Sequence, residues 1–295
     1  MDAHSFVKRR DRSPHGSFDD LARQKDGDID VALGAALVAR DAYPDLDVAA
    51  LLAELDALAA PLFAARLEEH RAEEQARILA EHLYDSHGFR GNEADYYDPK
   101  NSLLSDVLAR RLGIPLTLAI VYCEVARRVG VPARGVGFPG HFLVRIDRPR
   151  SLPGLIVDPF FRGRPLEEAE LKTRLVRALR VTDPGHPDDA PDLEPHLAAS
   201  SPRAILVRML TNLKAIYLTR GEKARAHLAI DRIASLLPNA AGPLFERARL
   251  AAQLGARESA RSDLTRALTL HPDANDEKLI RAELATLGEN RVSLN

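Results

Sequence analysis

Apolar residues recur at three- and four-residue spacing in three stretches of the chain before residue 88: Ile29 to Ala42, Val48 to Leu67 and Glu73 to Ser86. This period is typical of amphipathic helices, and Pro44 separates the first stretch from the second. The residues before them are polar and lack periodicity. The pattern therefore predicts a flexible arm over residues 1–27 and a helical layer over residues 28–87.

The pattern changes after a loop, GFRGNEADYYDPKN, that is rich in Gly, Asn and Asp. Asn101 is a plausible N-cap for a helix that ends at Gly113, and Pro115 suits the first turn of a second helix that ends at Gly130. Alternation in HFLVRI then predicts a strand that opens with His141. A second strand, LIVD, ends with Asp158. We expect a mixed α/β core over residues 88–180.

The C-terminal part contains an internal repeat. Gly221 recurs as Gly255 and Pro238 recurs as Pro272, each after 34 residues, and Ala226 and Ala260 share the same offset. This is the period of a tetratricopeptide helical hairpin. The repeats are expected over residues 203–295, with Lys278 to Leu287 as a capping helix, and a linker dense in Pro and Asp over residues 181–202. An unrelated helical bundle is the alternative.

Composition narrows the class of protein. The 295 residues carry a net charge of −2 and contain one cysteine, Cys123, so no internal disulfide is possible. We expect a cytoplasmic protein, because the cysteine count fits a reducing compartment and the N-terminus lacks the apolar segment of a secretory signal. The charge balance, the absence of Trp and the lack of a long uninterrupted apolar run predict neither a nucleic-acid nor a membrane partner.

The block GFRGNEADYYDPKNSLLSDVLARRLGIPLTLAIVYCEVARRVG, followed by GFPGHFLVRI and LIVDPFFRG, resembles the SirB1-like branch of the transglutaminase-like superfamily. That branch couples a transglutaminase-like core to C-terminal tetratricopeptide repeats. The resemblance implies an α+β, mostly helical fold, in which an N-terminal helical layer supports a papain-like core and helical hairpins follow. It also implies that His141 and Asp158 occupy the His and Asp positions of a Cys-His-Asp site.

The nucleophile that the resemblance requires belongs near Pro115 to Thr117, at the start of the second helix. No Cys is there, and Thr117 is the only hydroxyl-bearing residue. A helix N-terminus stabilises a thiolate, but it activates a threonine hydroxyl much less. Cys123 lies roughly 120° around the helix from Thr117 and sits in an apolar stretch, where a cysteine is usually inert. Thr117 as a cap or packed residue remains the simpler interpretation.

Four further residues are candidates for ligand binding. Arg134 and Arg145 flank the His141 region and suit a carboxylate ligand, although solvated strand-edge arginines are the common alternative. Tyr97 and Asn101 lie on or beside the loop, and loops with aromatics and amides often line clefts. A packed connector, with Asn101 serving a turn or cap, is the other reading. No metal-ligand spacing and no cofactor motif is found, so we expect neither a metal nor a cofactor.

Three functional hypotheses follow. The first is a catalytically degenerate transglutaminase-fold protein that binds a protein or peptide through its repeats and the cleft around His141, as a regulatory or adaptor module. The second is an amide hydrolase or acyl transferase that uses His141, Asp158 and either Thr117 or Cys123. In the third, the core is wholly structural and the repeats alone bind a partner.

Overall fold

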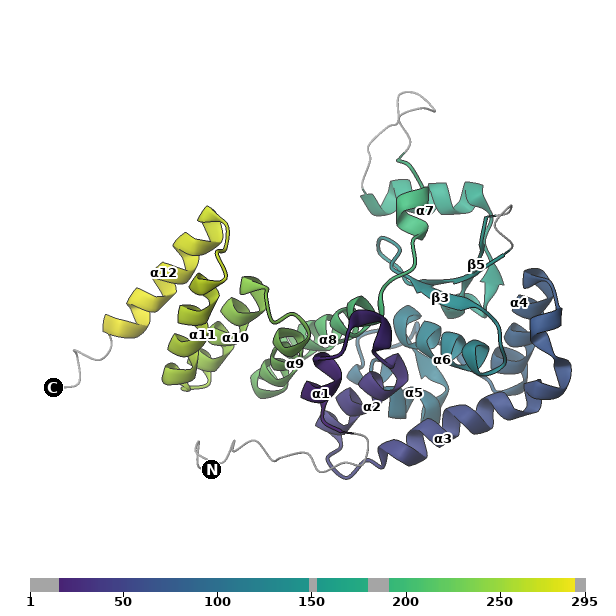
Figure 1. The fold of residues 1–295 in the computed structure, drawn as a ribbon, viewed down its shortest axis with the longest axis horizontal. Coiled ribbons are helices and arrows are strands. Elements are labelled where there is room, and N and C mark those ends of the chain that lie inside the picture. Colours follow the sequence, from purple (N-terminus) through teal and green to yellow (C-terminus); the bar gives the residue numbers. More distant parts are fainter. Residues whose placement is uncertain (1–15, 149–152, 180–190, 290–295) are drawn as a thin grey trace. The chain divides into compact units, whose positions relative to one another are not determined.

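The structure is a computed structural model that describes residues 16–148, 153–179 and 191–289. It divides into two compact units, residues 26–209 and residues 1–25 with 210–295. Figure 1 shows a mostly helical chain in which the strands are confined to the first of these units. The α+β, mostly helical fold class is therefore confirmed.

The larger unit begins with the predicted helical layer. Its helices have these bounds: α2 (Val31–Ala42), α3 (Val48–Ala59), α4 (Ala72–Ala80), α5 (Leu104–Arg110), α6 (Pro115–Arg128) and α7 (Glu168–Leu179). Short 3-10 turns join them: η1 (Asp26–Asp28), η2 (Ala60–Ala65), η3 (Leu67–Glu69), η5 (Pro99–Asn101), η6 (Pro159–Phe161) and η8 (Glu194–Leu197). A π-helical turn, η4 (Glu81–Ser86), directly extends α4.

The stretch Val48–Ala65, which covers α3 and η2, is long and apolar enough by composition to cross a membrane, and 33% of it is buried. Leu51, Leu55 and Leu58 lie on its buried face, and α3 packs against α6. These leucines place one face of the stretch in the core of this unit, and the remainder is partly or fully exposed.

The sheet is antiparallel, with the strand order β3 (Ala133–Val136), β4 (Leu143–Ile146), β5 (Leu155–Asp158) and β6 (Arg164–Pro165). A separate parallel pair joins β1 (Arg90–Gly91) to β2 (Leu112–Gly113). Helix α6 contacts β3 and β4, and α7 covers the other face through Leu171 and Leu175, which pack with Leu143 and Ile156. Figure 1 shows α6 and α7 on opposite sides of the strands. Both faces of the sheet are therefore buried.

Three local predictions need correction. The helix before Gly113 is α5, which ends at Arg110, and Gly113 itself lies in β2. Asn101 does not cap this helix, because Leu103 is the N-cap residue and Asn101 lies in the preceding 3-10 turn. The strand predicted to open with His141 begins at Leu143, since His141 lies in the bend after Gly140, whose φ is +70°. The start at Pro115 and the turn at Gly130 are confirmed.

The smaller unit contains the predicted repeats. After α8 (Pro202–Thr219), within which the division between units falls, come α9 (Lys223–Leu236), α10 (Ala241–Gln253), α11 (Arg257–Thr269) and α12 (Ala274–Glu289). Gly221 and Gly255 both have positive φ in the turns between helices, and Ala226 and Ala260 are fully buried. The positions that set the 34-residue period are thus structurally equivalent, and α12 follows where the capping helix is expected.

The ends of the predicted domains differ from the structure. Of the arm expected over residues 1–27, residues 1–15 lie outside the described part, but α1 (Phe18–Ala22) is a capped helix that buries Phe18 and packs against α9. Of the linker expected over residues 181–202, residues 181–190 lie outside the described part. Its remainder is held to the sheet, where the Ser200 N–H donates to the carbonyl of Gly135. Both segments are polar in sequence, so their composition did not predict these contacts.

Candidate functional site

The His141 and Asp158 side chains meet as the sequence suggests. The bend before β4 carries His141, and Asp158 is the last residue of the neighbouring strand β5. The Nε2 atom of His141 lies 2.9 Å from Oδ1 of Asp158. Asp158 is fully buried, whereas 18% of the His141 side chain is exposed. Because Nε2 faces the carboxylate, Nδ1 is the ring nitrogen that remains for another group.

A third residue, Arg174 on α7, completes the environment of Asp158. Its Nη1 donates to Oδ2 of Asp158 over 2.7 Å, and the backbone N–H of Phe160 donates to Oδ1 over 3.1 Å. Burial by itself raises the pKa of Asp158, but the hydrogen bonds and charges of His141 and Arg174 outweigh it, so the pKa of this carboxyl is lowered. Asp158 is therefore held as a carboxylate that orients the imidazole.

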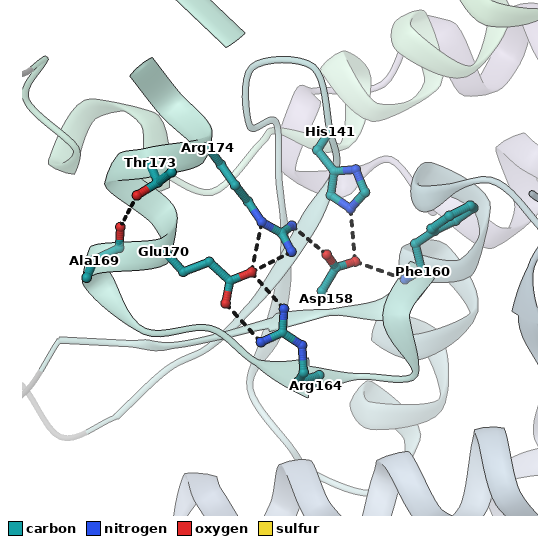
Figure 2. Close-up of polar contacts among 8 residues, drawn as sticks. All are labelled: His141, Asp158, Phe160, Arg164, Ala169, Glu170, Thr173 and Arg174. Atoms are coloured by element: carbon teal, nitrogen blue, oxygen red, sulfur yellow. Dashed lines mark hydrogen bonds and ion pairs between the residues drawn. The ribbon is translucent and has the colours of Figure 1, made fainter. Parts of the chain in front are cut away.

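The network continues away from the sheet. Glu170 on α7 accepts hydrogen bonds from both Arg174 and Arg164, and these contacts lower the pKa of Glu170 to about 2. Figure 2 shows the alternating row of charges from Arg164 through Glu170 and Arg174 to Asp158 and His141. The row ties α7 and β6 to the His–Asp pair, so the position of Asp158 depends on both elements.

Aromatic rings surround the imidazole. The ring of Phe161 is stacked on His141 with centroids 6.3 Å apart, and Phe160 meets His141 edge-on at 6.1 Å. Tyr96 packs edge-on against Phe160 at 6.1 Å and against Tyr97 at 5.4 Å. We call Tyr96, Tyr97, Phe160 and Phe161 the aromatic cluster. Three of its members are exposed to solvent: Tyr96 at 40%, Tyr97 at 74% and Phe161 at 44%.

The loop that carries the two tyrosines is held by amides. Asn101 is fully buried, and its Nδ2 donates to the carbonyls of Asp95 and Tyr96 over 2.7 and 3.3 Å. Its Oδ1 accepts from Nδ2 of Asn92 over 3.0 Å. The two alternatives for this loop are thus combined in one structure: Asn101 is a buried connector, and Tyr97 is presented to solvent.

The side chain of Thr117 is buried and hydrogen-bonded to backbone groups. Its side chain is completely buried, and its hydroxyl lies 2.7 Å from the carbonyl of Asn101 and 3.2 Å from that of Ile114. It also accepts the N–H of Ile114 over 3.1 Å. Through Asn101, the hydroxyl supports the loop beneath Tyr96. Within the described residues it forms no hydrogen bond with His141.

Cys123 lies two turns further along α6 and is partly exposed. Burial among its neighbours raises the pKa of its thiol well above the ordinary value. A thiol in this state carries little thiolate at neutral pH. Nothing in the described part of the chain hydrogen-bonds it to the His141 ring.

The two predicted carboxylate-binding arginines face each other across β3 and β4, and both pair with an internal acid. Arg134 Nε lies 3.0 Å from Oδ2 of Asp147, and Arg145 Nε lies 2.9 Å from its Oδ1. Arg145 also donates to the carbonyl of Leu197 over 3.0 Å. Asp147 therefore neutralises both guanidinium groups within the protein.

Sequence reasoning missed Arg174, Glu170 and the two phenylalanines after Asp158. The four-residue spacing of Glu170 and Arg174 is a visible helix-face signal. No pattern, however, connects Arg174 to a carboxylate 16 residues earlier. In the described ranges, no group of three or more His, Cys, Asp or Glu side chains is placed to hold a metal ion.

A cavity of about 270 Å³ lies between α4, η4 and β6. Its charged lining residues already pair with acids: Arg77 with Glu74 and Glu81, Arg162 with Asp85, and Arg164 with Glu170. The His–Asp pair with the aromatic cluster, rather than this cavity, is therefore the candidate functional site.

Comparison with known proteins agrees with this arrangement. Residues 49–211 match the transglutaminase-like superfamily, and residues 213–285 match the tetratricopeptide repeat. A UPF0162 protein of Xylella fastidiosa is 38% identical over 283 residues, which cover 93% of this chain and 96% of that protein. The UPF0162 protein PA3419 of Pseudomonas aeruginosa is 33% identical over 253 residues, which cover 86% of this chain and 89% of that protein.

A shorter similarity, to the F-box only protein 21 of mouse, reaches 49% identity over 63 residues, or 21% of this chain and 10% of that protein. No solved structure matches the chain. The matches to the superfamily and to the full-length relatives, together with the His–Asp pair in its core, show that this chain belongs to the transglutaminase-like superfamily, among the UPF0162 proteins, and carries C-terminal tetratricopeptide repeats.

Proposed function

We propose that this protein is a SirB1-like, catalytically degenerate transglutaminase-fold protein that binds a protein or peptide partner as a cytoplasmic regulatory or adaptor module. The observation that carries the proposal is the state of Thr117 at the start of α6. Its hydroxyl is buried and bonded to the Asn101 carbonyl and the Ile114 backbone, so it has no free position for attack on a substrate.

The environments of the two possible nucleophiles, Thr117 and Cys123, also support a catalytically degenerate site. A Thr nucleophile needs an adjacent base, and the hydroxyl of Thr117 is engaged with backbone groups instead. The thiol of Cys123 has its pKa raised by burial, which is opposite to the shift that activates a cysteine. The pair of His141 and Asp158 then has a binding or orienting role.

Two features support partner binding. Tetratricopeptide repeats generally mediate protein–protein interaction, and this chain carries them over residues 213–285. The aromatic cluster adds exposed ring surface beside His141 in the other unit. Exposed tyrosines at a fixed position are favourable contact residues, since they bury a large area and lose little conformational entropy on binding.

The test uses the immobilised full-length chain and a cell extract from its own source, with captured proteins quantified by mass spectrometry. A Tyr97→Ala variant removes a side chain that is 74% exposed and is expected to lose a specific partner. A Cys123→Ala variant is expected to retain it. If capture depends on Cys123 or forms a covalent adduct there, the adaptor role is wrong.

The second candidate is an amide hydrolase or acyl transferase that uses His141, Asp158 and either Thr117 or Cys123. It is favoured by one observation, the intact 2.9 Å contact between a partly exposed His141 and a buried carboxylate. Its test is release of ammonia from a glutamine-containing peptide. Release that Thr117→Val or Cys123→Ala abolishes, in a variant that still folds, replaces the adaptor proposal with the enzyme.

A further inference from the structure

One arginine near the candidate site differs from the others. Arg208, in the part of α8 that belongs to the larger unit, donates from Nη2 to the backbone carbonyl of His141 over 2.7 Å. Its guanidinium carbon lies 5.2 Å from the centre of the Phe142 ring. Arg208 is therefore fixed beside the bend that carries His141, and its position depends on that bend.

No acidic side chain neutralises Arg208 within the described residues. It forms no ion pair there, whereas Arg134, Arg145, Arg164 and Arg174 are each paired with a carboxylate. Burial lowers the pKa of Arg208. A half-buried cation without a counter-charge is unfavourable, and a ligand anion would relieve that cost.

The guanidinium also has donors to spare. One of its five N–H groups is used by the His141 carbonyl. Within the described residues, its remaining N–H groups form no further hydrogen bond. They are available for a planar acceptor such as a carboxylate, whose two oxygens match the geometry of a guanidinium.

Arg208 contacts the residue around which the aromatic cluster packs. It donates to the carbonyl of His141, and the ring of His141 is stacked on Phe161 and meets Phe160 edge-on. From Tyr96, ring contacts continue to Tyr97 at 5.4 Å, to Phe160 at 6.1 Å and from Phe160 to Phe161 at 5.3 Å. A cation and aromatic rings thus both contact His141, and Tyr96, Tyr97 and Phe161 are exposed.

We propose that this surface binds a peptide that places a carboxylate on Arg208 and an apolar or aromatic side chain on the rings of Tyr96, Tyr97 and Phe161. The inference rests on the proposed peptide-binding function and assigns the chemistry of the ligand. The carboxylate comes either from the C-terminus of the peptide or from an Asp or Glu side chain. Arg208, rather than Arg134 or Arg145, is the arginine that recognises it.

The test measures dissociation constants of small probes for the full-length protein by ligand-detected NMR. The probes are N-acetyl-phenylalanine, its neutral amide, and N-acetyl-phenylalanyl-glutamic acid amide. The first has a terminal carboxylate, the second has none, and the third has only a side-chain carboxylate. A charge-assisted contact predicts that at least one of the two acids binds about ten-fold tighter than the neutral amide. Which acid does so identifies the source of the carboxylate.

Three variants test whether Arg208 binds the carboxylate and whether Tyr97 contacts the probe. Arg208→Gln is expected to bind the acids no better than the neutral amide, while Arg208→Lys retains part of the preference. Tyr97→Ser should weaken all three probes by a similar factor, about three- to ten-fold, because it removes only ring contact. Arg71→Gln is the control, since Arg71 is an exposed arginine at the start of α4.

The comparison of acid with amide within one protein sample separates recognition from folding. If Arg208→Gln fails to fold, the carboxylate inference is tested by the wild type and Arg208→Lys. The quantity compared is the ratio of the dissociation constant of the neutral amide to that of each acid. Equal binding of acids and amide by the wild type overturns the carboxylate inference and leaves peptide binding intact. Failure of all three probes to bind also overturns it, and the proposed function is then judged by partner capture alone.

Discussion

The contact between Arg174 and Asp158 gives a quantitative prediction. Asp158 is fully buried and Arg174 is 24% exposed, with 2.7 Å between Nη1 and Oδ2. Replacement of Arg174 by Gln removes the positive charge and leaves the buried carboxylate with hydrogen bonds only from His141 and the Phe160 N–H. The protein should keep its fold and lose stability.

The magnitude follows from the environment. A hydrogen bond to a charged group contributes about 1.5–3 kcal/mol, and breaking a fully buried ion pair costs about 3–5 kcal/mol. Because Arg174 is partly exposed and glutamine retains an amide donor, we expect the free energy of unfolding to fall by about 2–3 kcal/mol. Urea unfolding followed by circular dichroism measures this loss. Arg177→Gln, which changes an exposed arginine on the same helix, is the matched control.

The pH dependence provides a second check. The pKa of Asp158 is lowered in the folded protein from its ordinary value of 3.8, so its contribution to stability is present above pH 3.8 and is lost as pH falls through the folded pKa. Without Arg174 the folded pKa of Asp158 lies closer to 3.8, so the stability lost on acidification below pH 3.8 should be smaller in Arg174→Gln than in the wild type. The reasoning is refuted if Arg174→Gln and Arg177→Gln unfold within about 0.5 kcal/mol of each other at neutral pH.

Three other predictions concern the surroundings of the site. Thr117→Val removes a buried hydroxyl bonded to the Asn101 carbonyl and should cost about 1–3 kcal/mol in urea unfolding, and an unchanged midpoint would show that the hydroxyl is not structural. Cys123 should react slowly with iodoacetamide at neutral pH, because burial raises the pKa of its thiol, and it should react rapidly once urea unfolds the chain. Alkylation is measured by mass spectrometry, and rapid alkylation of the folded protein would contradict this prediction. In Gly91→Ala the added Cβ would lie 2.5 Å from the Phe160 ring, so this variant should have a lower unfolding midpoint than the wild type. Gly27→Ala is the control, because the space around Gly27 is open. Equal midpoints for the two variants would show that Gly91 is not closely packed against Phe160.

Much of the fold follows from local pattern. The helices at Val31, Val48 and Pro115 begin within two residues of their predicted starts, because Asp30, Asp47 and a first-turn Pro115 are strong helix-start signals. The repeat was visible because Gly221 and Gly255 need the same positive φ. The prediction that Asn101 caps the helix was wrong because its side-chain amide hydrogen-bonds to carbonyls of the preceding loop. These carbonyls reach the amide only when the loop is folded.

The chain order of His141 and Asp158, together with the resemblance, predicted that the two residues share a site, since consecutive antiparallel strands bring such residues together. The resemblance supplied the expectation of a nucleophile, and the sequence itself showed that no cysteine stands at the start of α6. What happens to the hydroxyl of Thr117 could not be derived, because its acceptor, the Asn101 carbonyl, lies 16 residues away.

The sequence by itself determined the helix starts near Val31, Val48 and Pro115, the 34-residue repeat and the absence of a cysteine near Pro115, because these depend on residues that are close together along the chain. The tertiary structure alone decided which charges are neutralised. Arg134 and Arg145 pair with Asp147, Arg174 pairs with Asp158, and Arg208 has no acid within the described residues. The physical reason is that an ion pair depends on separation in space and on burial, and neither is encoded in the spacing of charges along a chain.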